Sequence, residues 1–338
     1  MYCTPVFHTL AHMISRIAAI SMLLFLFSCT HEKKEKVPSE AKPERIINVP
    51  SFNSDSAYTF VKTQIDFGPR VPLTKAHAAC AEFLISKLNQ SADSVIVQKG
   101  IVTTFDEKKL EMKNIIAQFS PQQKRRVLLC AHWDTRPWAD QDTVRKDEPG
   151  DGASDGASGV AVLLEIARQL KQSKPAIGID IIMLDAEDYG QPDNSPYQRK
   201  ENSYALGTQY WAKNPHVQNY YAEYGILLDM VGAKNATFNR ERFSMQYASS
   251  VLTKVWNMAN QIGYSDYFLF RDGGQITDDH YYINTIANIP CIDIIQNDPS
   301  THSGFGSYWH THQDNMSVID ANTLKAVGQT LLQVIYSE

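Results

Sequence analysis

The chain has 338 residues, of which 43% are hydrophobic and 20% are charged. This is the composition of a globular protein, and the length is enough for one sizeable core or two small ones. The formal net charge is −5, and no basic cluster with interleaved aromatic residues occurs in the body of the chain. Both observations argue against a nucleic-acid partner.

Residues 1–28 have the layout of a secretory signal. Arg16 precedes an apolar stretch, residues 17–27, which is too short for a membrane span. The sequence that ends in Ser28-Cys29 resembles a bacterial lipobox, so we expect Cys29 to become the lipidated first residue. An ordinary cleaved signal or a short anchor is the alternative. The prediction is a lipoprotein anchored to a bacterial membrane, facing the periplasm or the exterior, with no other membrane contact.

Residues 29–50 are rich in Lys, Glu, Pro and Ser, and we expect a flexible tether there. A single domain is predicted for residues 51–338. It contains Cys80, Cys130 and Cys291, which lack the short spacing of a thiolate zinc site. Buried free thiols are the expectation, and a disulfide between two of them is the alternative.

Periodicity predicts the elements of the first half of the domain. A helix capped by Ser54 and Asp55 is expected to end at Gly68-Pro69. Next come a second helix at residues 75–88 and three strands at residues 94–97, 113–119 and 127–131.

The clearest helix of the chain spans residues 160–170 and follows a turn-forming sequence that begins at Asp155. Further elements are expected as apolar strands at residues 179–184, 224–228 and 290–295, and as a last helix at residues 321–336. Alternation of strands and helices predicts an α/β fold. We expect a three-layer sandwich with a mixed, mostly parallel central sheet and helices on both faces.

Polar residues follow the ends of the predicted strands. The acidic pair Glu187-Asp188 comes just after one apolar strand, and His132, Asp229 and His310 follow three others. Carboxylates at the edge of a core lose solvation, so they are usually matched by a cation. Because ligands in such sheets gather at the carboxyl ends of the strands, the pattern predicts a zinc enzyme.

The order of these motifs resembles one family. The motifs are, in chain order, His132-Trp133-Asp134, residues 152–159, Glu187-Asp188, Asp229 and Trp309-His310-Thr311. They resemble the zinc aminopeptidase superfamily and, within it, the glutaminyl cyclases, over about residues 55–338. Paired aspartates before His280, and Trp309 directly before His310, favour the cyclase branch.

The resemblance implies one zinc ion per chain, held by Asp155, Asp188 and His310. The family usually has glutamate at the second of these positions, so Asp188 is a departure, and its shorter reach requires a local adjustment. Glu187 matches the general acid and base of the family. His132 is then expected to support the ligands instead of binding the metal.

The resemblance also implies the substrate pocket. Asp278 would hydrogen-bond the reacting nitrogen, helped by Asp293, and Asp229 would position the amine. Trp309 would form an apolar wall. The tryptophan that the family places after the acidic pair is missing, so we expect Tyr189 to contribute to the wall, with Trp138 as an alternative.

The predicted activity is that of a glutaminyl-peptide cyclotransferase, which converts an N-terminal glutamine of peptides or proteins to pyroglutamate and releases ammonia. A di-zinc aminopeptidase is the first alternative, because His132, Asp155 and Asp229 match the ligands of a second zinc. A catalytically silent lipoprotein that captures peptide N-termini is another. We expect a monomer whose partners are peptides with N-terminal glutamine.

Overall fold

The structure, a computed structural model, describes residues 48–338. The predicted signal segment, the lipidation residue Cys29 and nearly all of the predicted tether lie outside the described residues. Within residues 48–338, no helix has the length and apolar character needed to cross a membrane.

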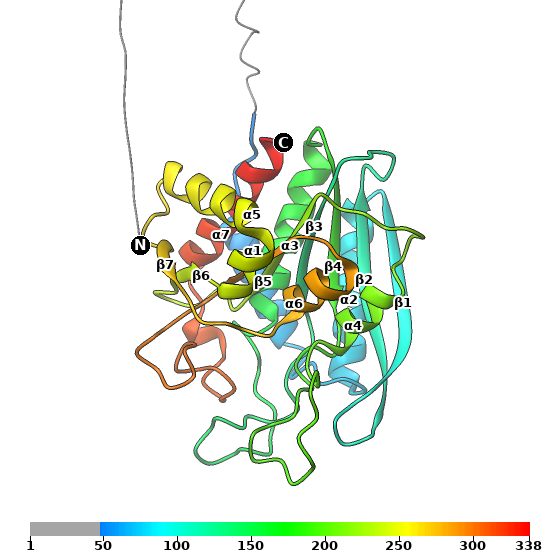
Figure 1. Cartoon of the computed structure of the whole chain (residues 1–338), viewed down its shortest axis with the longest axis vertical. Helices are drawn as coiled ribbons and strands as arrows, with labels where there is room; N and C mark the ends of the chain where they lie inside the picture. The colour runs from blue at the N-terminus through cyan, green and yellow to red at the C-terminus, as the bar shows by residue number, and fades with distance from the viewer. Residues whose placement is uncertain (1–47) are drawn as a thin grey trace, which may run out of the picture. The chain divides into compact units, whose positions relative to one another are not determined.

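A six-stranded sheet forms the centre of the fold (Figure 1). In spatial order its strands are β1 (Ser94–Thr103), β2 (Lys109–Phe119), β4 (Gly178–Leu184), β3 (Arg126–His132), β5 (Tyr224–Asp229) and β8 (Cys291–Ile295). The last four strands in this order run parallel to one another, β2 is antiparallel to its neighbour β4, and β1 is antiparallel to β2. The expected mixed, mostly parallel sheet is therefore confirmed.

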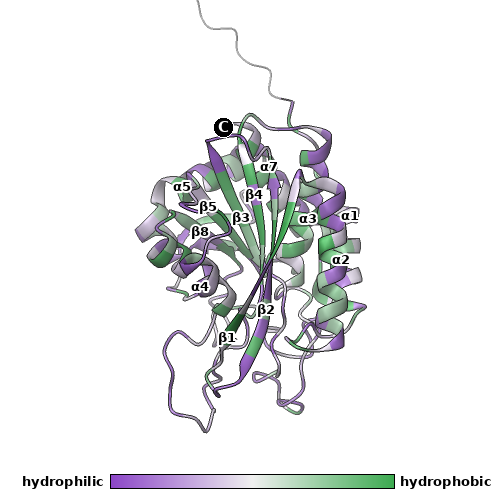
Figure 2. Cartoon of the chain, turned by 90° about the vertical axis from the view of Figure 1, so that its right-hand side faces the viewer, coloured by the Kyte–Doolittle hydropathy of each residue, from purple (hydrophilic) through white to green (hydrophobic). Residues whose placement is uncertain are grey.

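Side chains alternate between two buried faces of this sheet. Ile115 and Ile181 belong to one apolar core, whereas their neighbours Ile116 and Ile182 belong to another. The first core also contains residues of α1 (Ser54–Ile65), α2 (Lys75–Ser91), α3 (Ala157–Gln172) and α7 (Ala321–Tyr336). The second contains residues of α4 (Leu206–Lys213) and the π-helical turn η1 (Ile283–Ala287). Figure 2 shows α1, α2 and α3 on one side of the sheet and α4 on the other, which confirms the three layers.

Helix α5 (Arg242–Gln261) covers the free edge of the sheet at β8. The main-chain N–H of Asp293 in β8 donates to Ser244 Oγ of α5 at 3.0 Å, so this edge is not open for pairing. A second sheet has two strands, β6 (Phe238–Arg240) and β7 (Phe268–Asp272). In the sequence, β6 precedes α5 and β7 follows it. The remaining elements are the short helix α6 (Asp279–Tyr282) and the 3-10 turn η2 (Met316–Val318).

Several predicted details differ from the structure. The side chain of Asn53 caps α1, where Ser54 and Asp55 were expected to do so. Strands β1 and β2 are longer than predicted, because they pair with each other along their whole length. The domain's three cysteines, Cys80, Cys130 and Cys291, are buried and free, which confirms the first expectation for them.

Helix α3 approaches strand β5 most closely at Gly159. A Cβ atom there would overlap the carbonyl oxygen of Leu228. We therefore expect Gly159→Ala to lower the free energy of unfolding by about 1–3 kcal/mol, as overpacking does elsewhere. Chemical denaturation measures this effect. Gly274→Ala is the control, because a Cβ at Gly274 meets no atom within 4 Å, and equal stabilities of the two variants would contradict the prediction.

Candidate metal centre and active site

The predicted site residues come from the carboxyl end of the central sheet. His132 is the last residue of β3 and Asp229 the last of β5, while Glu187 and Asp188 follow β4 by a short turn. Asp155 lies just before α3. The expectation that strand ends would converge on one site is met, as the fold of parallel α/β sheets requires.

Three turns of this site have left-handed backbone at residues other than glycine. The φ angles are 54° at Ala186, 48° at Met230 and 54° at His310. Such conformations cost about 1–3 kcal/mol each and are found mostly at functional sites. The turn at Ala186 explains how neighbouring residues of one chain segment, Glu187 and Asp188, both line the same pocket.

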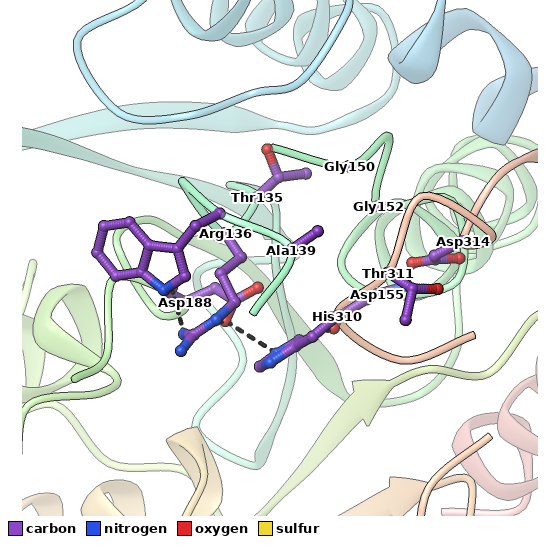
Figure 3. A pocket seen from close by; sticks show the side chains of 11 residues that line it. Thr135, Arg136, Ala139, Gly150, Gly152, Asp155, Asp188, His310, Thr311 and Asp314 are labelled. Atoms are coloured by element: carbon purple, nitrogen blue, oxygen red, sulfur yellow. Dashed lines mark hydrogen bonds and ion pairs between the residues drawn. The ribbon is translucent and has the colours of Figure 1, made fainter. Parts of the chain in front are cut away.

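Asp155, Asp188 and His310 form a compact group of metal-ligating side chains. Nε2 of His310 lies 3.4 Å from Oδ1 of Asp188 and 3.6 Å from Oδ2 of Asp155. One potential ligand atom from each residue lies within 4.8 Å of the other two. In Figure 3, dashed lines join Asp188 to His310 and to Arg136. Two carboxylates and one imidazole are a suitable donor set for zinc.

His132 belongs to a second group that shares Asp155 with the first. Its Nε2 lies 3.1 Å from Oδ1 of Asp155 and 3.2 Å from Oδ1 of Asp229. The structure thus brings together both ligand sets that were considered from the sequence, the one-zinc set and the additional residues of a two-zinc set.

The charges around these histidines favour a cation. Burial lowers the pKa of His132, but the carboxylates of Asp134, Asp155 and Asp229 outweigh burial and raise this pKa well above its usual value. Burial and Arg136 lower the pKa of His310, and Asp188 among its acidic neighbours raises it above the ordinary value. Positive charge is thus stabilised where a divalent ion would bind, so these residues fit zinc.

Zinc uptake is expected to depend on pH for the same reason. A raised pKa means that the imidazole keeps its proton to higher pH, and this proton must leave before the ring nitrogen can bind a metal. Zinc affinity should therefore increase as the pH rises through the range of about 6 to 8 in which histidines titrate. Competition titration against a chromophoric chelator would measure this increase. A constant affinity over the range would contradict it.

Two further aspartates hold the ligand-bearing backbone. Asp134 accepts hydrogen bonds from the main-chain N–H groups of Glu187 and Asp188, both at 3.1 Å. Asp314 accepts those of Ser154 at 2.7 Å and Asp155 at 3.0 Å. Neither aspartate was assigned a role from the sequence. Asp134 lies two residues after His132 and Asp314 four residues after His310, and this closeness to a motif histidine could have indicated a supporting role.

A pocket of about 520 Å³ opens beside the metal-ligating group. Apolar parts of its wall come from Tyr204, Ile276, Phe305 and Trp309, and the indole of Trp309 stacks on the His310 ring at 3.7 Å between centroids. The other lining residues are Asp155, Glu187, Asp188, Asp229, Met230, Thr277, Asp278, Ile295 and His310. The predicted residue Trp309 is thus part of the wall.

Glu187, Asp229 and Asp278 bring their carboxyl groups to this pocket. Burial raises the pKa of Glu187 well above its usual range, and it raises that of Asp229 to about 7. The pKa of Asp278 is also raised by burial. Carboxyl groups with raised pKa values in a pocket are suited to proton transfer near neutral pH.

Two residues expected in the pocket lie elsewhere. The ring of Tyr189 packs against Trp138 and Phe105, with centroids 5.3 and 6.4 Å away, and Tyr204 occupies the wall in its place. Asp293 is fully buried and does not line the pocket. One of its oxygens lies within 4.8 Å of a potential ligand atom of Asp278 and of one of His280.

His280 does not line the pocket and contacts Glu241. Its Nε2 lies 3.0 Å from Oε2 of Glu241, and both side chains are buried. Asp278 caps α6 through a hydrogen bond from the N–H of Asp279.

Comparison with known proteins identifies the family. The model of peptidase family M28 matches residues 114–335. A solved Zn-dependent exopeptidase of Parabacteroides distasonis is 55% identical, with a TM-score of 0.85 over 86% of this chain and 100% of the other. The glutaminyl cyclase of Tannerella forsythia is 53% identical, with a TM-score of 0.84 over 86% of this chain and 100% of the other.

A more distant relative extends the match to animals. The glutaminyl-peptide cyclotransferase of Bos taurus is 24% identical over 91% of this chain and 89% of its own length. The resemblance inferred from the motifs is thereby confirmed. The chain belongs to peptidase family M28 and, within that family, to the glutaminyl cyclases.

Proposed function

We propose that this protein is a zinc-dependent glutaminyl-peptide cyclotransferase that converts N-terminal glutamine to pyroglutamate and releases ammonia. The observation that carries the proposal is the meeting of Glu187 and the group Asp155, Asp188 and His310 in one pocket. The similarity to glutaminyl cyclases of other organisms supports it.

In the reaction, the substrate's own α-amine attacks the side-chain amide carbonyl. A C–N bond forms, a five-membered lactam closes, and the amide nitrogen leaves as ammonia. The nucleophile is tethered to its target, so closure is entropically favoured and needs no activated water. Zinc bound by the three ligands would supply Lewis acidity that polarises the amide carbonyl.

Glu187 moves the proton. Its carboxylate accepts a proton from the attacking amine and returns one to the departing nitrogen, which requires a pKa nearer to neutrality than that of an exposed glutamate. The raised pKa of Glu187 agrees with this role. Asp229 and Asp278, on the same pocket, hold the amine and the amide nitrogen by hydrogen bonds.

The apolar wall excludes water from the reacting amide. Trp309, Phe305 and Ile276 line the pocket beside the carboxyl groups. Water admitted there would compete as a nucleophile and hydrolyse the amide, so this wall favours cyclisation.

We assign one zinc ion to each chain. Cyclisation requires one Lewis acid only, because the substrate's own amine is the nucleophile and no metal-bound water is needed. The remaining features stay proposals: residues 51–338 as one catalytic domain, a monomer, and a lipid on Cys29 that anchors the protein to a membrane. Peptides and proteins with N-terminal glutamine are the proposed substrates.

A di-zinc aminopeptidase is the second candidate, because His132, Asp155 and Asp229 form a second potential metal group and one similar structure is that of an exopeptidase. The test is to incubate the zinc-loaded protein with a peptide that begins with glutamine. Ammonia release with a mass loss of about 17 Da, as the lactam chemistry requires, and one zinc per chain supports the cyclase. Free glutamine with two zincs per chain would establish the peptidase instead.

A further inference from the structure

Arg136 connects two of the proposed zinc ligands. Its Nη1 donates to the main-chain oxygen of Asp188 at 3.1 Å and to Oδ1 of the same residue at 3.3 Å. Its Nε and Nη2 donate to the two carboxylate oxygens of Asp140 at 2.8 and 2.9 Å. Oδ1 of Asp140 lies 3.1 Å from Nδ1 of His310. Because His310 Nε2 faces Asp188, these four residues form a closed ring, hereafter the Arg136–Asp140 ring.

The ring is held firmly in place. Arg136 is 4% exposed, and its guanidinium lies 5.5 Å from the ring centroids of both Trp138 and Tyr204. The main-chain N–H of Gln141 donates to the carbonyl oxygen of His310 at 3.2 Å, so the loop that carries Asp140 is also attached to the ligand's own backbone. A planar guanidinium that binds Asp140 through two nitrogens and Asp188 through the third fixes the angle between these partners, and the single nitrogen of a lysine would not do so.

We propose that Arg136 and Asp140 are positioning residues that set the geometry and the affinity of the zinc site. The inference rests on the assignment of Asp155, Asp188 and His310 as ligands. Asp188 is shorter than the glutamate that the resemblance leads one to expect, and Arg136 holds both its main chain and one carboxylate oxygen. The short side chain is thereby fixed beside His310, whose Nε2 lies 3.4 Å from the same Oδ1. Asp140 orients His310 so that Nε2 faces the ligand group.

The test compares Arg136→Gln, Arg136→Lys and Asp140→Asn with a matched control, Arg126→Gln. Arg126 is also buried and also pairs with an aspartate, Nε lying 2.7 Å from Oδ2 of Asp180, but it stands at the first residue of β3, away from the site at the other end. The measurements are zinc affinity by chelator competition, the visible absorption spectrum of the cobalt-substituted proteins, and thermal stability without metal.

We expect Arg136→Gln and Asp140→Asn to lower zinc affinity about 10- to 100-fold, as loss of outer ligand partners does, and to change the cobalt spectrum. Arg136→Lys should restore part of the affinity, since lysine keeps the charge but not the fork. Arg126→Gln should lower stability while leaving affinity and spectrum unchanged.

The inference is overturned if Arg136→Gln and Asp140→Asn keep the affinity and spectrum of the unaltered protein, or if Arg126→Gln changes them equally. If Arg136→Gln does not fold, Asp140→Asn decides by the same criteria. Failure of the proposed function is a separate result. It would show as absence of cyclisation by the unaltered, zinc-loaded protein, whatever the variants do to metal binding.

Discussion

Replacing His310 by alanine is expected to abolish both zinc binding at the proposed site and cyclisation. His310 supplies the only nitrogen of the three-residue group, and its Nε2 faces both Asp155 and Asp188. Removing a ligand should cost more than the roughly 100-fold in affinity that the loss of a supporting residue costs. Zinc content after dialysis and the rate of ammonia release are the two measurements.

The control for this variant is His302→Ala. His302 is an exposed histidine of the same segment between β8 and η2, so it should leave zinc content and rate unchanged. A His310→Ala protein that retains one tightly bound zinc, which a further His132→Ala substitution removes, would show that the ion sits in the group with His132. Metal in that position would reverse the assignment of His132 as a supporting residue.

Glu187→Gln is expected to lower kcat by about 10²- to 10⁴-fold, the contribution typical of a positioned general base. Glutamine has nearly the same shape but cannot accept the amine proton. Metal binding should persist, because Glu187 belongs to none of the three potential metal-ligating groups of the described residues. Single-turnover cyclisation and zinc content on the same samples provide the measurement.

Glu111→Gln is the control, because it removes a carboxylate from the exposed surface of β2, away from the pocket. It should leave kcat and zinc content unchanged. The same experiment separates an enzyme from a silent peptide-binding protein. An enzyme loses turnover in Glu187→Gln while peptide affinity stays close to that of the unaltered protein. Turnover that persists at the original rate would exclude Glu187 as the base.

Elements with strong periodicity could be predicted from the sequence. Helix α7 was expected at residues 321–336 and lies there, since Asp320 caps it and its apolar stripe is continuous. The buried parallel strands β3, β4 and β5 were also placed correctly, because each carries an apolar run, which Asp180 alone interrupts in β4. The full length of β1 and β2 depends on the pairing of the two strands with each other. The pattern of residues within either strand does not reveal this pairing.

Site residues that directly follow a strand could be predicted from the sequence. Site residues whose position depends on the path of a long loop could not. Tyr189 was expected in the pocket wall, but Tyr204, from the end of the long segment after the acidic pair, occupies it. Arg136 and Asp140 had no signal, because their partners Asp188 and His310 are distant in the chain. The path of an irregular loop is set by such tertiary contacts and not by residue spacing.

The left-handed turns at Ala186, Met230 and His310 have a consequence for the choice of metal. Because such backbone persists only where the surrounding structure over-determines it, we infer that the fold itself sets the path of the ligand-bearing segments. A metal that does not have to drive folding competes on coordination chemistry alone. At a site of two carboxylates and one imidazole, the divalent ions then rank by their affinity for nitrogen and oxygen donors, with zinc and cobalt ahead of manganese.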